Sequence, residues 1–206
     1  MTAESRAEPA PLKRDEKWLA VGAVVVGVGA SLAIAATATA TLVHDLSGGL
    51  SFVAPFTSED ASLPIGPGGA DVAVQVQQAT IDAPDTPAIS VASHVVEIAG
   101  GAAAAVTIAL CLTWLCLNIA RGRVFDRGNE RLLSACAVAA GVGWFVTLLF
   151  GAMTINGAFA SISAGDYDNV LAEVNFTPLI ATFVFGVLAA AFRVGSRLEK
   201  AAEGLV

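Results

Sequence analysis

Four long stretches without a single charged or histidine side chain constrain this chain more than any other feature. They run over residues 18–43, 98–120, 132–155 and 174–192. A helix that crosses a bilayer needs about 20 predominantly apolar residues. Because hydrocarbon offers no partner for backbone amides and carbonyls, each stretch is expected to be helical. The sequence therefore predicts an all-α integral membrane protein, a bundle of four transmembrane helices.

The composition excludes two other classes of chain. Only 14% of the 206 residues are charged and 55% are hydrophobic, whereas soluble domains average about 25% charged residues. That balance leaves too little polar surface for a soluble globular protein. Disorder over the whole chain is excluded as well, since it requires low hydrophobicity and high net charge.

The positions of Lys and Arg predict the orientation of the chain. All 11 of them lie in residues 1–17, 121–131 and 193–206. Cytoplasmic segments of membrane proteins collect Lys and Arg because positive charge resists translocation. Both termini and the central loop are therefore expected to be cytoplasmic. The remaining segments, 44–97 and 156–173, carry ten of the 18 Asp and Glu residues and no Lys or Arg, as expected of an outer face.

The N-terminal region allows two interpretations of the first stretch. Residues 1–17 are rich in Ala, Pro and charge and have no periodic pattern, which predicts a disordered cytoplasmic tail. Ala38-Thr39-Ala40 resembles the cleavage site of a signal peptide. The apolar run over 18–43 is longer than the usual apolar region of a signal peptide, so an uncleaved membrane anchor is the preferred interpretation and cleavage is the alternative.

The outer segment 44–97 combines turn sequences with strand-like runs. Residues 72–76 alternate between Val and small or polar residues, which is typical of a half-buried strand. Leu50–Phe56 and Ala88–Val91 are the candidates to pair with it. The sequence therefore predicts a small β-containing extracytoplasmic loop at the outer ends of the helices.

Three titratable residues near the ends of the first two stretches form a candidate outer cluster. His44 and His94 bracket the outer segment, and Glu97 directly precedes the second stretch. If the two helices pack together, the imidazoles and the carboxylate are expected to lie close. Two His with a carboxylate can bind Zn²⁺, but two histidines at a membrane boundary are more commonly interface residues. Neither a metal nor any other cofactor is therefore expected.

The loop over residues 121–131 and the C-terminal segment form the candidate docking face for a cytosolic protein. The loop reads as a tight hairpin between two spans in which Asp126 or Asn129 caps the next helix. A purely structural turn is the alternative to a docking surface, and Arg side chains there are expected to reach lipid phosphates. The candidate docking residues are Gly122, Arg123, Phe125, Asp126, Arg127, Asn129, Arg131, Gly195 and Leu198.

Two short motifs in these segments resemble those of a bacterial family of four-span membrane proteins, the Domain of Unknown Function 2975 family. A Gly-x-x-Phe-x-x-x-Asn-x-x-x-Leu loop is matched by Gly122, Phe125, Asn129 and Leu133, and a Gly-x-x-Leu ending by Gly195 and Leu198. The chain departs from the family in its long Ala-rich N-terminus and its less acidic tail. The resemblance implies a bacterial cytoplasmic-membrane protein without an established activity. Some relatives are encoded beside a small helix-turn-helix regulator, which implies a cytosolic protein partner.

The sequence favours a binding protein over an enzyme or a carrier. It has no HExxH, nucleophile elbow or phosphate-binding P-loop. The middles of the four stretches lack the charged residues that ion-coupled carriers use. We expect a non-enzymatic binding, regulatory or accessory subunit in contact with membrane lipids, without direct nucleic-acid binding because no concentrated basic patch is present. A small transporter or channel subunit is the alternative.

Small residues spaced four apart within the stretches predict close helix packing. The pairs are Gly27 and Ser31, Gly100 and Ala104, and Ala137 and Gly141. Packing within one chain is the preferred interpretation of these pairs. Formation of a homo-oligomer is the alternative.

Overall fold

A computed structural model describes residues 14–163 and 174–203, which form four long helices and one β-hairpin. The helices are α1 (Arg14–Leu46), α2 (Ala88–Ala120), α3 (Arg127–Ser163) and α4 (Thr177–Glu203). The hairpin consists of β1 (Leu50–Leu63) and β2 (Val72–Ala83), joined through a short 3₁₀ turn at Pro67–Gly69. All four helices are long and apolar enough to cross a membrane, as the sequence predicts.

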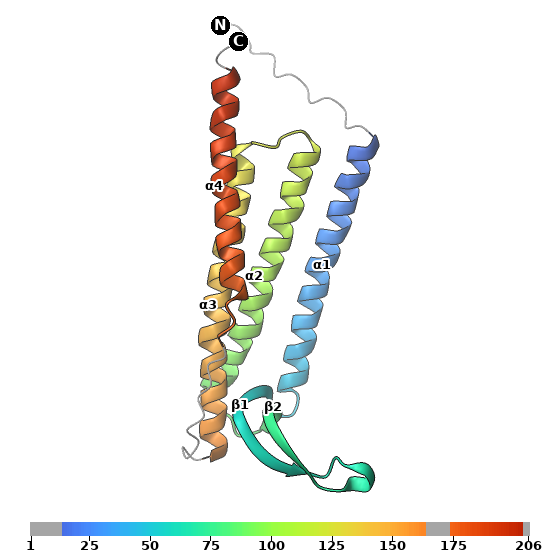
Figure 1. Cartoon of the computed structure of the whole chain (residues 1–206), viewed down its shortest axis with the longest axis vertical. Coiled ribbons are helices and arrows are strands. Elements are labelled where there is room, and N and C mark those ends of the chain that lie inside the picture. Colours follow the sequence, from blue (N-terminus) through green and yellow to red (C-terminus); the bar gives the residue numbers. More distant parts are fainter. Residues whose placement is uncertain (1–13, 164–173, 204–206) are drawn as a thin grey trace.

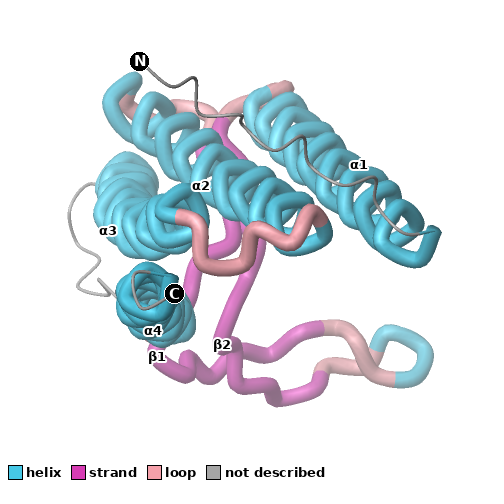
Figure 2. The backbone as a smooth tube through the Cα atoms, turned by 90° about the horizontal axis from the view of Figure 1, so that it is seen from above, coloured by secondary structure: helices cyan, strands magenta, loops and turns pink. Residues whose placement is uncertain are grey.

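Successive helices pack side by side. α1 lies against α2, α2 against α3 and α3 against α4, so that α1 and α4 occupy opposite sides of the assembly (Figures 1 and 2). Leu115 of α2, Leu133 of α3 and Ala189 of α4 form a shared buried cluster. Many large apolar side chains, among them Val25 and Phe183, point outward and are exposed. A large exposed apolar surface is unfavourable in water, so these side chains require an apolar environment around the helices.

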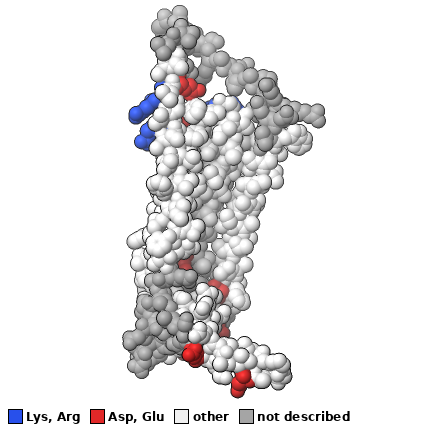
Figure 3. Space-filling model, viewed as in Figure 1, with Lys and Arg blue, Asp and Glu red and all other residues white. Residues whose placement is uncertain are grey.

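The two ends of the helices differ in charge. The start of α1, the α2–α3 loop and the end of α4 lie at one end (Figure 1). Figure 3 shows the Lys and Arg side chains gathered at this end, which we call the basic end. The hairpin lies at the opposite end, which we call the hairpin end. The three cation-bearing segments therefore share one side, as the sequence predicts.

The hairpin confirms the predicted pairing of its two strands. β1 and β2 are antiparallel, with a register shift between Pro55 and Glu59. One face of the paired strands nearest the helices is buried, whereas the side chain of Val53 on the other face is exposed. The buried residues Leu50, Phe52, Ala54 and Ala83 pack against Ala158 and Phe159 of α3. Beyond the register shift the hairpin extends away from the helices (Figure 1).

The prediction of a third strand at Ala88–Val91 is wrong. These residues form the first turn of α2, where the amides of Ser90 and Val91 donate to the carbonyl of Pro87 at 2.9 and 3.2 Å. Pro87 is the N-cap residue of α2, with an extended ψ of 142°, and as a proline it has no amide that would need a partner there. The sheet is consequently a two-stranded hairpin.

The helices extend beyond the apolar stretches that predicted them. α1 begins at Arg14, so residues 14–17 are helical rather than part of a disordered tail, and residues 1–13 lie outside the described part of the chain. α2 begins at Ala88 instead of residue 98, and α4 continues through residues 193–203. Charged residues end a hydrophobic span without ending a helix, because Arg, Lys and Glu are good helix formers.

Small residues bring neighbouring helices into close contact within the chain. A Cβ at Gly27 of α1 would overlap the side chain of Thr113 on α2. A Cβ at Gly100 of α2 would lie 2.7 Å from Cγ1 of Val146 on α3. The predicted small-residue contacts therefore serve packing between helices of one chain at these two positions.

Replacing Gly27 with alanine tests the contact between α1 and α2. The hydroxyl of Thr113 donates to the carbonyl of Ala109 at 2.7 Å, so its side chain is held in place and the helices must separate. We expect Gly27→Ala to lower the free energy of unfolding by about 1–3 kcal/mol, as overpacking does. Gly29→Ala is the matched control, because a Cβ there meets nothing within 4 Å. SDS titration of the protein in mixed micelles measures both, and equal stability of the two variants would contradict the contact.

Candidate functional site

A cavity of about 410 Å³ lies at the hairpin end, where α1, α2, α3 and the hairpin meet. His44, His94 and Glu97 all line it, so the structure brings the predicted outer cluster together. The rest of the lining is contributed by Thr41, Asp45, Ser51, Phe52, Val53, Thr80, Thr154 and Ile155. The cavity therefore combines titratable side chains with hydroxyl and apolar groups.

His94 connects α1 to α2 inside this cavity. Only 6% of its surface is exposed. Its Nε2 lies 3.0 Å from Oδ2 of Asp45, in the last turn of α1, and its Nδ1 lies 3.7 Å from Oε2 of Glu97 on its own helix. Glu97 in turn lies against α3, since a Cβ at Gly151 would be 2.9 Å from its Oε1. One imidazole and two carboxylates thus join three helices.

The contacts of this group are those of a polar network that connects helices. A catalytic hydroxyl or thiol is hydrogen-bonded to its base, but in the described part of the chain none is hydrogen-bonded to His94. The hydroxyl of Thr154, which lines the same cavity, donates instead to the carbonyl of Phe150 at 2.9 Å. Over residues 14–163 and 174–203, no three His, Cys, Asp or Glu side chains are placed to hold a metal ion. The zinc interpretation therefore gains no support from these residues.

Removing the Asp45 carboxylate tests the network. In Asp45→Ala the buried His94 loses its 3.0 Å partner, and an unsatisfied buried polar group costs about 1–3 kcal/mol. We expect a loss of unfolding free energy of that size by SDS titration, and little further loss in Asp45→Ala combined with His94→Ala. Asp85→Ala is the control, because Asp85 is exposed. Additive losses in the double variant would contradict a direct interaction between Asp45 and His94.

At the basic end, α2 is followed by a glycine in the left-handed backbone conformation. Gly122 has a φ of 74°. Its amide donates to the carbonyl of Ile119, and the amide of Arg123 donates to the carbonyl of Asn118, both at 2.9 Å. This pair of bonds is the Schellman motif, in which glycine is favoured because it has no Cβ. The first glycine of the predicted loop motif therefore ends the helix.

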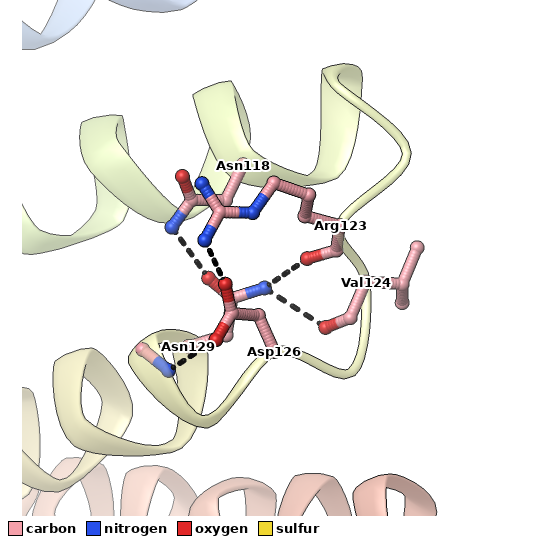
Figure 4. A network of polar contacts seen from close by, with 6 residues as sticks. Asn118, Arg123, Val124, Asp126 and Asn129 are labelled. Carbon is pink, nitrogen blue, oxygen red and sulfur yellow. Dashed lines mark hydrogen bonds and ion pairs between the residues drawn. The ribbon is translucent and has the colours of Figure 1, made fainter. Parts of the chain in front are cut away.

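The side chain of Asn129 is hydrogen-bonded to the backbone of the α2–α3 loop (Figure 4). It is fully buried, with 0% of its surface exposed. Its Nδ2 donates to the carbonyls of Arg123 and Val124 at 2.6 and 2.8 Å, and its Oδ1 accepts from Nδ2 of Asn118 at 2.7 Å. The side-chain amide thus satisfies two loop carbonyls and connects the start of α3 to the end of α2.

Asp126 caps α3, one of the two residues predicted to do so. Its Oδ1 accepts from the amide of Gly128 at 3.0 Å, and its other oxygen pairs with Arg123 (Figure 4). The pKa of the Asp126 carboxyl lies below its usual value. The hydrogen bond from the Gly128 amide is the main cause, and the Arg123 guanidinium adds to it. The carboxylate that these groups require is therefore the form present at neutral pH.

The two motifs that carry the family resemblance are in direct contact. The ring of Phe125 lies on Gly195 of α4, where any Cβ would overlap it. Its centroid is 5.8 Å from that of Phe192. Leu133, at the end of the loop motif, lies in the buried cluster shared by α2, α3 and α4. The loop motif and the C-terminal motif are therefore two halves of one packing arrangement.

The predicted docking residues divide into buried and exposed groups. Asn129 has no exposed surface, so it fixes the loop and does not itself touch a partner. Gly122 allows the positive φ at the end of α2. Gly195 leaves room for the Phe125 ring. The exposed members, which remain available for contact, are Arg123, Phe125, Arg127, Arg131 and Leu198.

Asp45 at the hairpin end was not among the predicted site residues, because nothing in its sequence context marks one acid in an acidic segment as the partner of a distant histidine.

Comparison with known proteins adds no relatives. The chain matches no protein-family model, and comparisons with curated proteins and with solved structures find no match either. Membership of the Domain of Unknown Function 2975 family therefore stays a prediction from the two motifs. The contact between Phe125 and Gly195 gives those motifs a physical reason to occur together.

The isosteric substitution Asn129→Asp tests the loop clamp. A carboxylate cannot donate to the carbonyls of Arg123 and Val124, so both lose their partner. We expect the free energy of unfolding to fall by about 1–3 kcal/mol, and the loop to become cleavable by trypsin under native conditions. Arg121→Gln, an exposed change in the same loop, is the control. A loop that resists trypsin in Asn129→Asp as well as in the parent protein would contradict this role.

Proposed function

We propose that this chain is a non-enzymatic regulatory or accessory protein of the bacterial cytoplasmic membrane that binds a cytosolic protein. The basic end faces the cytoplasm in this proposal. Its support is that the cation-bearing segments, namely the start of α1, the α2–α3 loop and the end of α4, lie at one end of four apolar helices (Figure 1). Cytoplasmic segments of membrane proteins tend to collect cations.

The observation that carries the proposal is a loop that is rigid in its backbone yet exposed in its side chains. Asn129 holds the backbone from beneath, and Gly195 receives the Phe125 ring from the side. The side chain of Arg123 is nevertheless 60% exposed, and Val124 and Phe125 are 36% and 40% exposed. A preorganised surface loses little conformational entropy when it binds, which favours recognition.

The end of α4 extends this surface with apolar side chains. Val194 and Leu198 are 55% and 66% exposed and lie one helical turn apart, so they share a face. An arginine beside exposed apolar groups suits a partner with an acidic and apolar surface, because aromatic residues and arginine are enriched in protein interfaces. We therefore define the docking surface as Arg123, Val124, Phe125, Val194 and Leu198.

The alternative, a small transporter or channel subunit, has less support. The cavity described above lies at the hairpin end of the helices. Carriers bind their substrates near the middle of the membrane. Solute flux through liposomes that contain the purified protein would favour this alternative.

Site-specific photo-cross-linking in native membranes tests the docking surface. A photoreactive amino acid placed at Val124 or Leu198 is expected to give one discrete cross-linked product with a cytosolic protein, identified by mass spectrometry. The added change Arg123→Glu should reduce that product about fivefold or more, as loss of a charged interface contact does. The same probe at Ile65, an exposed position in the hairpin turn, is the control.

The possible products separate the interpretations. A product that contains a second copy of this chain would replace the cytosolic partner with a homo-oligomer. Products with lipid alone, at both Val124 and Leu198, would overturn the docking proposal. A product that persists unchanged with Arg123→Glu would remove that arginine from the surface.

A further inference from the structure

A second cavity, of about 210 Å³, lies at the basic end between the start of α3 and the end of α4. It is lined by Arg127, Glu130, Arg193, Ser196, Arg197 and Lys200. Four of the six side chains are cations and one is a carboxylate. The docking surface has no residue in this lining, so the two features are separate.

The cations converge because of their spacing along α4. Arg193, Arg197 and Lys200 follow one another at intervals of four and three residues, so they lie on one face of the helix. The first turn of α3 supplies Arg127 opposite this face. The spacing thus concentrates positive charge from two helices in one small space.

Among the described residues, one of the four cations, Arg193, has an acidic partner. Arg193 contacts Oε1 of Glu130 at 2.6 Å through Nε and through a terminal nitrogen. In the part of the chain that the structure describes, Arg127, Arg197 and Lys200 form no ion pair. Lys200 is close enough to Asp126 to lower the pKa of that carboxyl, but Asp126 is itself paired with Arg123. Three of the cations that line this cavity therefore have no ion-pair partner among the described residues.

We propose that this cavity binds the phosphate of an anionic phospholipid headgroup. Arginine presents a planar fork of donors that matches phosphate oxygens, and lysine adds a point charge. Glu130 holds the Arg193 guanidinium, and both residues line the cavity. Basic pockets between membrane helices on the cytoplasmic side are the kind of site that binds acidic lipid headgroups.

The position along α4 assigns the phosphate to a lipid and not to a soluble anion. The charge-free stretch of α4 ends at Phe192, and Arg193 is the next residue. The cavity therefore begins where the helix leaves its apolar segment, at the level where headgroup phosphates lie.

Lipid binding to the purified full-length protein tests the site. The protein in nonionic detergent micelles is titrated with phosphatidylglycerol, with phosphatidylcholine, or with inorganic phosphate, and retained molecules are counted by native mass spectrometry. We expect one phosphatidylglycerol to be retained about tenfold more tightly than phosphatidylcholine, because only the former carries net negative charge. Inorganic phosphate should neither be retained nor displace the lipid at millimolar concentration.

Two pairs of variants assign the binding to these residues. Arg197→Gln with Lys200→Gln should weaken phosphatidylglycerol binding about 10- to 30-fold, since each cation near an anionic lipid contributes roughly a fivefold factor. Lys17→Gln with Arg121→Gln removes the same charge from exposed positions at the basic end and should leave binding unchanged. Glu130→Gln frees Arg193 and should tighten binding about fivefold, whereas Glu199→Gln, an exposed acid outside the lining, should not.

Each other outcome overturns the proposal. Equal retention of the two lipids, or equal weakening in the two double variants, would mean that charge at this end acts without a site. Retention of inorganic phosphate with displacement of the lipid would assign the cavity to a soluble phosphate. SDS titration confirms that each variant is folded. Because the photo-cross-links at Val124 and Leu198 do not depend on these cations, failure of either test leaves the other proposal standing.

Discussion

The buried side-chain amide of Asn129 is the interaction on which the basic end depends. It donates to two loop carbonyls and accepts from Asn118, so it fixes where α3 begins relative to the end of α2. That position sets the Phe125 ring against Gly195, which in turn fixes the rotation of α4. The rotation decides which α4 side chains face α3. One uncharged amide therefore governs both the exposed loop and the cationic cavity beside it.

The fold was predictable wherever it follows from the polarity of the environment. The four apolar helices, the pairing of Leu50–Phe56 with the alternating strand and the common side of the cations all follow from that rule. Helix ends were not predictable from hydropathy, because charge limits burial in hydrocarbon and does not stop a helix. The strand predicted at Ala88–Val91 fails for a related reason, since four residues are too few to show the period that distinguishes a helix from a strand.

Three members of the outer site were predictable from the sequence, but the fourth member and the geometry were not. His44, His94 and Glu97 do line one cavity, but the closest partner of His94 is Asp45, which reaches it through the packing of α1 on α2. Sequence separation gives no sign of such a pair. At the other end, Asn129 was expected either to cap a helix or to touch a partner. Its complete burial assigns it to neither role, and burial is a property of the whole packed structure.

The two strands of the hairpin both have an unpaired edge. A ribbon of two strands consists entirely of edges, and each edge carries backbone amides and carbonyls that the sheet itself leaves open to a further strand. Pro55, which has no amide to donate to a further strand, lies in β1 beside the register shift. Asp60 and Asp82 place exposed charges along the two strands. These features discourage the pairing of one hairpin with the hairpin of a second copy, which would otherwise extend into a continuous sheet.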